Sequence, residues 1–89
     1  MKVQTALDWQ NVSGPLMEQM RTAPYSTRKD LARMLGNIEH MVQELASEEV
    51  NMRRARKQQT PVQQQWLAQI DEAIGDFQHW ALLAHLSGT

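Results

Sequence analysis

The chain has 89 residues, 42% of them apolar and 21% charged, and its nine basic and ten acidic side chains leave a net charge of −1. This composition is typical of a globular protein and argues against disorder. A dedicated nucleic-acid binder usually carries a clear positive excess, which is missing here. There is no cysteine, so disulfides and thiolate metal sites are excluded.

Residue choice predicts an all-α fold, because no segment alternates apolar and polar residues as a half-buried strand does. We expect a long antiparallel helical hairpin with a short helical N-terminal segment, similar to a three-helix bundle. The predicted parts of this single domain, residues 1–89, are an N-terminal segment at 1–25 and long helices at 27–57 and 61–86. We also expect a cytoplasmic protein, since no run is apolar enough to span a membrane and residues 1–10 lack a signal-peptide core.

The N-terminal segment is predicted to be broken into short pieces. Proline removes a helical hydrogen bond, so Ser13-Gly14-Pro15 indicates one break and Pro24 a second. Residues 16–23 would then form two helical turns. Residues 5–12 would form either a further short helix or an extended lead-in.

The helix at 27–57 is expected to begin at a Ser26 or Thr27 cap, with Asp30 in its first turn, where negative charge is favourable. Helical spacing places seven residues on one apolar face: Leu31, Met34, Leu35, Ile38, Met41, Val42 and Leu45. Beyond Leu45 this face becomes charged. The basic run at 53–57 would lie at the carbonyl end of the helix, where cations are stabilising.

The helix at 61–86 has the clearest start. Thr60 suits the N-cap, Pro61 the first helical position, and Gln63 completes a Thr-x-x-Gln capping box. Its apolar positions are Trp66, Leu67, Ile70, Ala73, Ile74, Phe77, Trp80, Ala81 and Ala84. We expect the helix to end near Ser87, with Gly88 as the residue that follows the cap.

The connection between the long helices is short, which makes them antiparallel neighbours. Facing positions are predicted to sum to about 117–118 for a tight turn, which places Ile38 near Trp80 and Leu45 near Ala73. A helix of this length spans roughly 45 Å. Two helices alone leave a ridge uncovered, so either the N-terminal segment or a second copy should cover it.

Two groups of residues are candidates for partner binding. At the hairpin tip these are Glu49, Arg53, Arg56 and Trp66, because an indole beside arginine is typical of a binding hot spot; the alternative is that Trp66 belongs to the core. Glu49 and Arg53 are also spaced to form a local ion pair. Near the C-terminus Leu82, Leu83 and Leu86 lie off the apolar stripe and need a cover, either the N-terminal segment or a partner.

No catalytic or cofactor-binding residues are predicted. His40, Glu44, Asp76 and His79 would lie at similar heights on the two long helices, but helical spacing points them away from the shared apolar face, so we predict no metal site. No nucleophile-base set and no glycine-rich phosphate loop is present. We therefore expect that the protein is not an enzyme.

Residues 27–45, TRKDLARMLGNIEHMVQEL, resemble the helix-turn-helix of bacterial transcription regulators, with Ala32, Gly36 and Val42 at that family's spacing. The resemblance implies a turn at Gly36–Asn37, with Glu39, His40 and Gln43 facing the major groove. One uninterrupted helix instead buries Met34, Ile38 and Met41 on one side, and we favour it. Nucleic-acid binding through residues 27–45 and the basic run 53–57 is the alternative.

In broad shape the predicted hairpin is similar to the small helical-hairpin chaperones and anti-activators of bacteria. This similarity implies a non-enzymatic, protein-binding module of adaptor, chaperone, inhibitor or anti-activator type, or a phage or plasmid accessory factor. The expected partner is another protein or a second copy of the chain.

Overall fold

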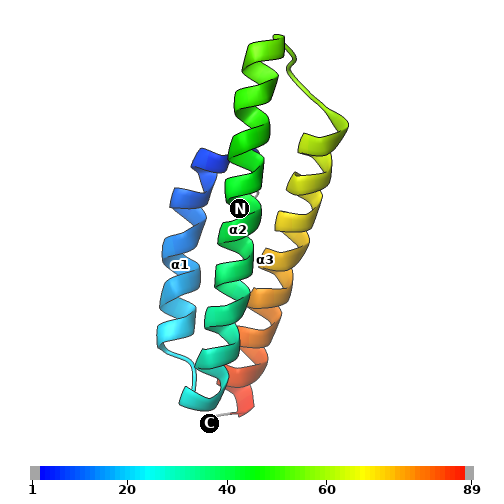
Figure 1. The fold of residues 1–89 in the computed structure, drawn as a ribbon. Coiled ribbons are helices and arrows are strands. Elements are labelled where there is room, and N and C mark those ends of the chain that lie inside the picture. Colours follow the sequence, from blue (N-terminus) through cyan, green and yellow to red (C-terminus); the bar gives the residue numbers. More distant parts are fainter. Residues whose placement is uncertain (1–2, 88–89) are drawn as a thin grey trace.

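The computed structural model describes residues 3–87, and within them it contains a short 3-10 helix and three α-helices and no strand. The elements are η1 (Ala6–Asp8), α1 (Trp9–Arg21), α2 (Tyr25–Ala55) and α3 (Pro61–Ser87). Each α-helix is antiparallel to the next, and α1 is much shorter than the α2–α3 hairpin (Figure 1). The molecule measures 51 × 18 × 15 Å. The predicted all-α bundle is confirmed, whereas the predicted cap at Gly88 lies outside the described residues.

The predicted break at residues 13–15 is wrong, because α1 continues through Ser13, Gly14 and Pro15. Trp9, Val12 and Leu16 are buried on one side of α1, at spacings of three and four residues. Pro15 lies on the exposed side, where its missing hydrogen bond leaves an acceptor that water can reach. Burial of the apolar side thus outweighs the local cost of proline.

The start of α2 also differs from the prediction. Pro24, and not Ser26 or Thr27, is the N-cap, and its carbonyl accepts bonds of 3.0 Å from the N–H groups of Thr27 and Arg28. Since α2 begins at Tyr25, its first turn has no acidic residue, and Asp30 lies beyond it.

The end of α2 lies two residues before the predicted boundary at 57. Ala55 is the last helical residue, and Arg56 takes the left-handed conformation with φ of 55°. The Arg56 N–H donates to the Arg53 carbonyl at 3.2 Å, and the Lys57 N–H donates to the Met52 carbonyl at 2.9 Å. This pair of bonds is a Schellman motif, which satisfies the last carbonyls of the helix.

Between these ends α2 is continuous, with no turn at Gly36–Asn37. A helix-turn-helix is therefore not formed in residues 27–45. Leu31, Leu35 and Ile38 are buried on one side, as one uninterrupted helix requires. They join the central core, which also contains Val3, Trp9, Val12, Leu16, Val42, Leu45, Ile70, Ile74, Phe77 and Ala81.

The predicted register between α2 and α3 is wrong at the start of α3. The prediction placed Glu48 opposite Gln69 or Ile70, but the Thr60 hydroxyl donates to the Glu48 carboxylate at 3.3 Å. The chain does not turn tightly after α2. Residues 57–60 run back alongside α2, and α3 begins well below the tip (Figure 1).

Thr60 is nevertheless the cap that the sequence predicts. The Gln63 N–H donates to its hydroxyl oxygen at 3.1 Å, and α3 begins at Pro61. The same hydroxyl caps α3 and contacts Glu48 of α2. The Thr60 side chain therefore lies at the start of α3 and at the height of Glu48 on α2.

Candidate protein-binding surfaces

The hairpin tip is built differently from the predicted binding site. The Glu49 carboxylate is half-buried and accepts a hydrogen bond of 2.9 Å from the Ala6 N–H at the start of η1. The predicted Glu49–Arg53 pair is not formed: the ion pairs recorded between described residues are Arg21–Glu18 at 3.3 Å and Arg33–Asp30 at 3.6 Å. Glu49 thus ties the N-terminal segment to α2.

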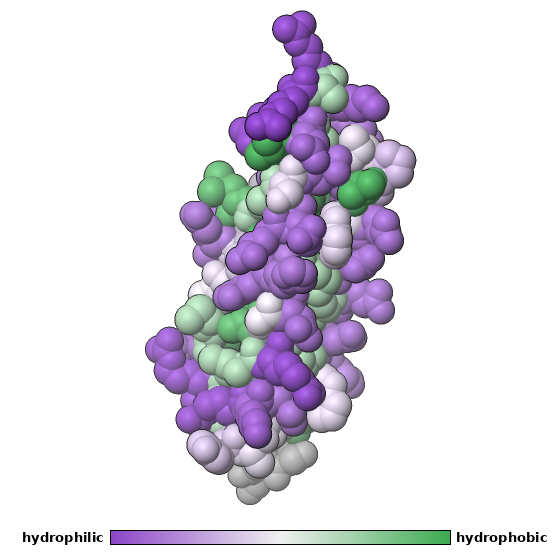
Figure 2. Space-filling view, in the orientation of Figure 1, coloured by the Kyte–Doolittle hydropathy of each residue, from purple (hydrophilic) through white to green (hydrophobic). Residues whose placement is uncertain are grey.

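The four cations of the basic run, Arg53, Arg54, Arg56 and Lys57, are exposed, and none takes part in these ion pairs. Figure 2 shows hydrophilic side chains covering the tip. Met52 differs from the predicted charged face, because it is buried with only 7% of its surface exposed. Trp66 is half-buried and packs against the core, which agrees with the alternative reading of this residue.

The second predicted group lies on the outer surface of the last turns of α3. Leu82, Leu83 and Leu86 are 56%, 44% and 62% exposed. Phe77 and Ala81, in the same part of α3, are buried against the bundle, so the leucines occupy the opposite side of the helix. We call Leu82, Leu83 and Leu86 the C-terminal patch.

Helix α1 reaches only the edge of this patch. A pocket of about 200 Å³ lies between the end of α1 and α3, lined by Gln19, Thr22, Ala23, Gln78, Ala81, Leu82 and His85. Leu82 borders the pocket and is still more than half exposed. The N-terminal segment, one of the two predicted covers, therefore leaves most of the patch open.

Contacts of α1 fix which side of the hairpin it covers. On α2 this side carries Glu49, which accepts the hydrogen bond from the Ala6 N–H just before α1. On α3 it carries Gln78 and His85, which line the pocket shared with α1. Within residues 3–87, the opposite side of the hairpin is left without a covering helix.

Two rows of apolar residues border this uncovered side. Met34 and Met41 are seven residues apart on α2, and Glu48, seven further on, points at α3 through its bond to Thr60. Trp66, Ala73 and Trp80 are spaced by seven on α3, so they share one side of that helix. All except Trp80 are half-buried and pack against the core. We call these five residues the open face.

Trp80 corrects the prediction that it lies in the core opposite Ile38. Ile38 is 1% exposed, whereas Trp80 is 54% exposed. Trp80 lies at the margin of the buried stripe of α3, which accounts for the exposure of its ring. Since Leu83 follows one turn later, Trp80 joins the open face to the C-terminal patch.

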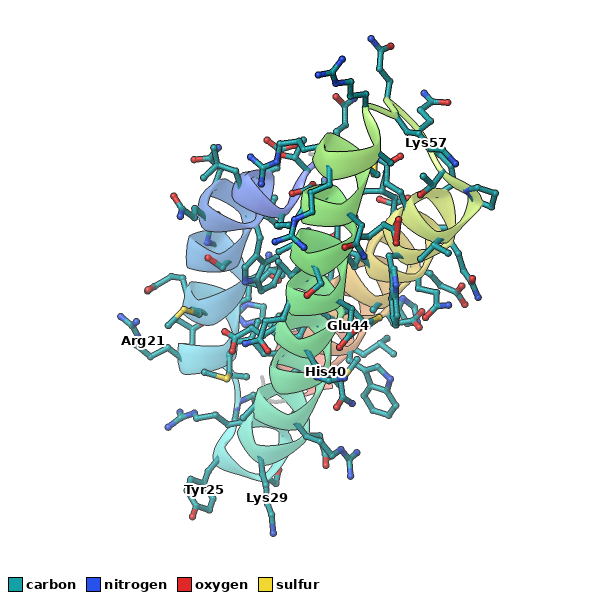
Figure 3. The ribbon with its side chains drawn as sticks, turned by 45° about the horizontal axis from the view of Figure 1, so that its top comes forward. Arg21, Tyr25, Lys29, His40, Glu44 and Lys57 are labelled. Carbon is teal, nitrogen blue, oxygen red and sulfur yellow. The ribbon has the colours of Figure 1, made fainter. Side chains whose placement is uncertain are left out.

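Carboxylates flank the open face. Glu44 on α2 and Asp76 on α3 are exposed, and neither takes part in the ion pairs recorded between described residues. Glu44 and His40 project from the side of α2 away from α1 (Figure 3). The surroundings are acidic as well: residues 34–52 contain four carboxylates and no Lys or Arg, and residues 58–87 contain three and none.

The same region contains the residues considered for a metal site, His40, Glu44, Asp76 and His79. Over residues 3–87, no three side chains of His, Asp or Glu are grouped closely enough to hold a metal ion. Nor does any helix in this range combine the length and apolar character needed to cross a membrane.

Comparison of the chain with protein-family models, curated proteins and solved structures found no match. The open face was missed in the sequence, because Met34, Met41, Ala73 and Trp80 were assigned to the shared apolar face, and Trp66 was considered only for the hairpin tip or the core. Spacing alone gave no signal for these rows, because the buried Leu31, Ile38 and Leu45 are also spaced by seven residues.

Proposed function

We propose that this protein is a small, non-enzymatic, cytoplasmic binding module that acts on another protein through its uncovered apolar surface, as an adaptor, chaperone, inhibitor or anti-activator does. The C-terminal patch carries the proposal. Three leucines and Trp80 are 44–62% exposed on two turns of one helix. Apolar residues clustered in this way mark interaction sites on soluble proteins more often than isolated surface leucines do.

The test compares a patch variant with a matched control. Leu82→Gln/Leu83→Gln/Leu86→Gln removes the apolar surface and keeps good helix formers. Val50→Gln/Val62→Gln changes two apolar residues that are 37% and 45% exposed elsewhere. Affinity capture with quantitative mass spectrometry, in an extract of the native host, should retain a protein on the unaltered chain and the control and lose it on the patch variant.

A second copy of the chain is the other partner that the proposal allows. Sedimentation equilibrium should then show a dimer that the patch variant dissociates and the control does not. Protein capture of either kind should change little between low and moderate salt, because apolar burial dominates. If capture is equal on all three proteins and each is a monomer, the proposal is wrong.

Duplex binding by the exposed basic run is the alternative, and the same proteins test it. Binding that falls by about 0.9 log unit per log unit of salt for each phosphate neutralised would indicate contacts to a nucleic-acid backbone. Arg53→Glu/Arg54→Glu/Arg56→Glu should abolish such binding. Under our proposal this variant still captures the protein partner.

A further inference from the structure

We propose that the open face binds an amphipathic helix of another protein, one whose apolar side is flanked by Lys or Arg. The inference rests on the proposed function, because the open face continues through Trp80 into the C-terminal patch. It adds the shape and the charge of the partner. Neither is specified by exposed leucines alone.

The shape follows from the two apolar rows. Met34 and Met41 form a ridge along one side of α2, and Trp66, Ala73 and Trp80 form one along a side of the antiparallel α3, because each set is spaced by seven residues. Ridges of this kind accept a further helix, as in helical bundles and in helix-in-groove recognition. Over residues 3–87 the chain has no strand, and so offers a partner strand no sheet edge.

The length of the partner segment follows from the α3 row. Trp66 and Trp80 are separated by four helical turns, or about 21 Å at 1.5 Å per residue. A helix of about 15 residues would cover this distance. Its apolar residues would contact the ring of Trp80, which has the largest exposed fraction on the open face.

The charge follows from the carboxylates. Glu44 and Asp76 flank the face from opposite helices and lack ion-pair partners within the described chain. A partner with basic flanks would supply the missing counter-charges, and complementary charge favours encounter and correct orientation. Nucleic acid and anionic lipid surfaces would be repelled by the same carboxylates.

The carboxylates also argue against a second copy at this face. Two open faces related by a two-fold axis would bring Glu44 and Asp76 of one chain to the same acidic surface on the other. Like charges placed against each other in an interface are unfavourable. The basic runs of both copies lie at the hairpin tips, away from the centre of the face.

The test measures binding of two fluorescein-labelled synthetic helical peptides to the full chain. The peptides share one leucine-rich side and differ only in its flanks, which are Lys in one and Glu in the other. By fluorescence anisotropy at about 50 mM salt, the Lys peptide should bind at least about ten-fold more tightly. The ratio should shrink at about 500 mM salt, where screening is strong.

Two variants with equal charge changes locate the effect. Glu44→Gln/Asp76→Asn removes the flanking carboxylates and should reduce the preference for the Lys peptide by about three-fold or more. Glu39→Gln/Asp71→Asn removes two exposed carboxylates from other sides of the helices and should leave the preference unchanged. Trp80→Ala should weaken both peptides by at least about ten-fold, as expected for an aromatic residue that contacts a partner directly.

The possible failures are distinguishable. Equal binding of both peptides, or a preference for Glu, would overturn the predicted charge and leave the proposed function standing. No binding of either peptide, or self-association lost in Trp80→Ala, would overturn the helical partner at this face. The proposed function fails only in its own experiment, on the leucines of the C-terminal patch.

Discussion

The two sides of the α2–α3 hairpin both carry apolar residues, but they differ in how far those residues are buried. On one side α1 supplies Trp9, Val12 and Leu16, which are 9%, 6% and 1% exposed. On the other side no helix is added, and Trp80 remains 54% exposed. Helical spacing identifies an apolar stripe, but the number of neighbouring helices decides how much of it is buried. A short α1 covers one side and leaves the other without a covering helix within the described residues.

The largest expected effect separates the two sides directly. Trp9→Ala should lower the free energy of unfolding by about 3–5 kcal/mol, because it removes a buried aromatic side chain and leaves a cavity. Trp80→Ala should lower the free energy of unfolding by less than about 1 kcal/mol, since more than half of the surface of Trp80 is already exposed to water. Urea unfolding followed by circular dichroism measures both values.

An equal loss for Trp80→Ala would contradict the comparison. It would mean that Trp80 is covered in solution, for example by a second copy of the chain. The stability of the unaltered protein would then rise with its concentration, because association stabilises only the folded state. If the urea midpoint does not depend on protein concentration and Trp80→Ala has a small effect, Trp80 is exposed in solution and the two sides differ as described.

Local signals in the sequence predicted much of the hairpin. The Thr60-Pro61 start of α3 and the uninterrupted run of α2 through Gly36 followed from capping chemistry and apolar spacing, which depend on neighbouring residues. The path of residues 57–60 did not follow, because its direction is set by contacts such as Thr60 with Glu48. The register at the start of α3 depends on that path.

In the N-terminal region, local sequence signals predicted a break that the structure does not contain. Proline and glycine at 14–15 indicated a break, but tertiary burial of Trp9, Val12 and Leu16 maintains the helix across them. Of the predicted binding residues, Leu82, Leu83 and Leu86 form one exposed patch, whereas Glu49 accepts a hydrogen bond from the Ala6 N–H. A side chain that accepts a hydrogen bond from a backbone group far away in the sequence cannot be recognised from its sequence neighbours.

An intermediate effect tests how the covered side is held in place. Glu49→Ala removes the acceptor for the Ala6 N–H at the start of η1, and should lower the free energy of unfolding by about 1–2 kcal/mol. Glu49→Gln keeps an acceptor and should lose less. Unfolding measurements, with amide hydrogen exchange at Ala6, report both the global and the local change.

The matched variant is Arg53→Ala. If Glu49 acted through a local pair with Arg53, both alanine variants would lose only a few tenths of a kcal/mol, as exposed helical pairs do. The structure predicts unequal losses, with exchange at Ala6 accelerated in Glu49→Ala alone. Equal small losses would show that the N-terminal segment is not anchored by Glu49.

The smallest effect is that of Gly36→Ala on the outer surface of α2. Its sign differs between a continuous helix and a helix-turn-helix. A side chain at Gly36 meets nothing within 4 Å, and the backbone there is helical with negative φ. Gly36→Ala should therefore raise the free energy of unfolding by about 0.5–1 kcal/mol, because alanine loses less backbone entropy in a helix. Gly75→Ala is the internal control in α3, with equally open surroundings. A helix-turn-helix places Gly36 in a turn that favours glycine, so there alanine would destabilise while Gly75→Ala still stabilised. Parallel gains at both positions require one continuous α2, and continuity places Met34 and Met41 on one side of that helix.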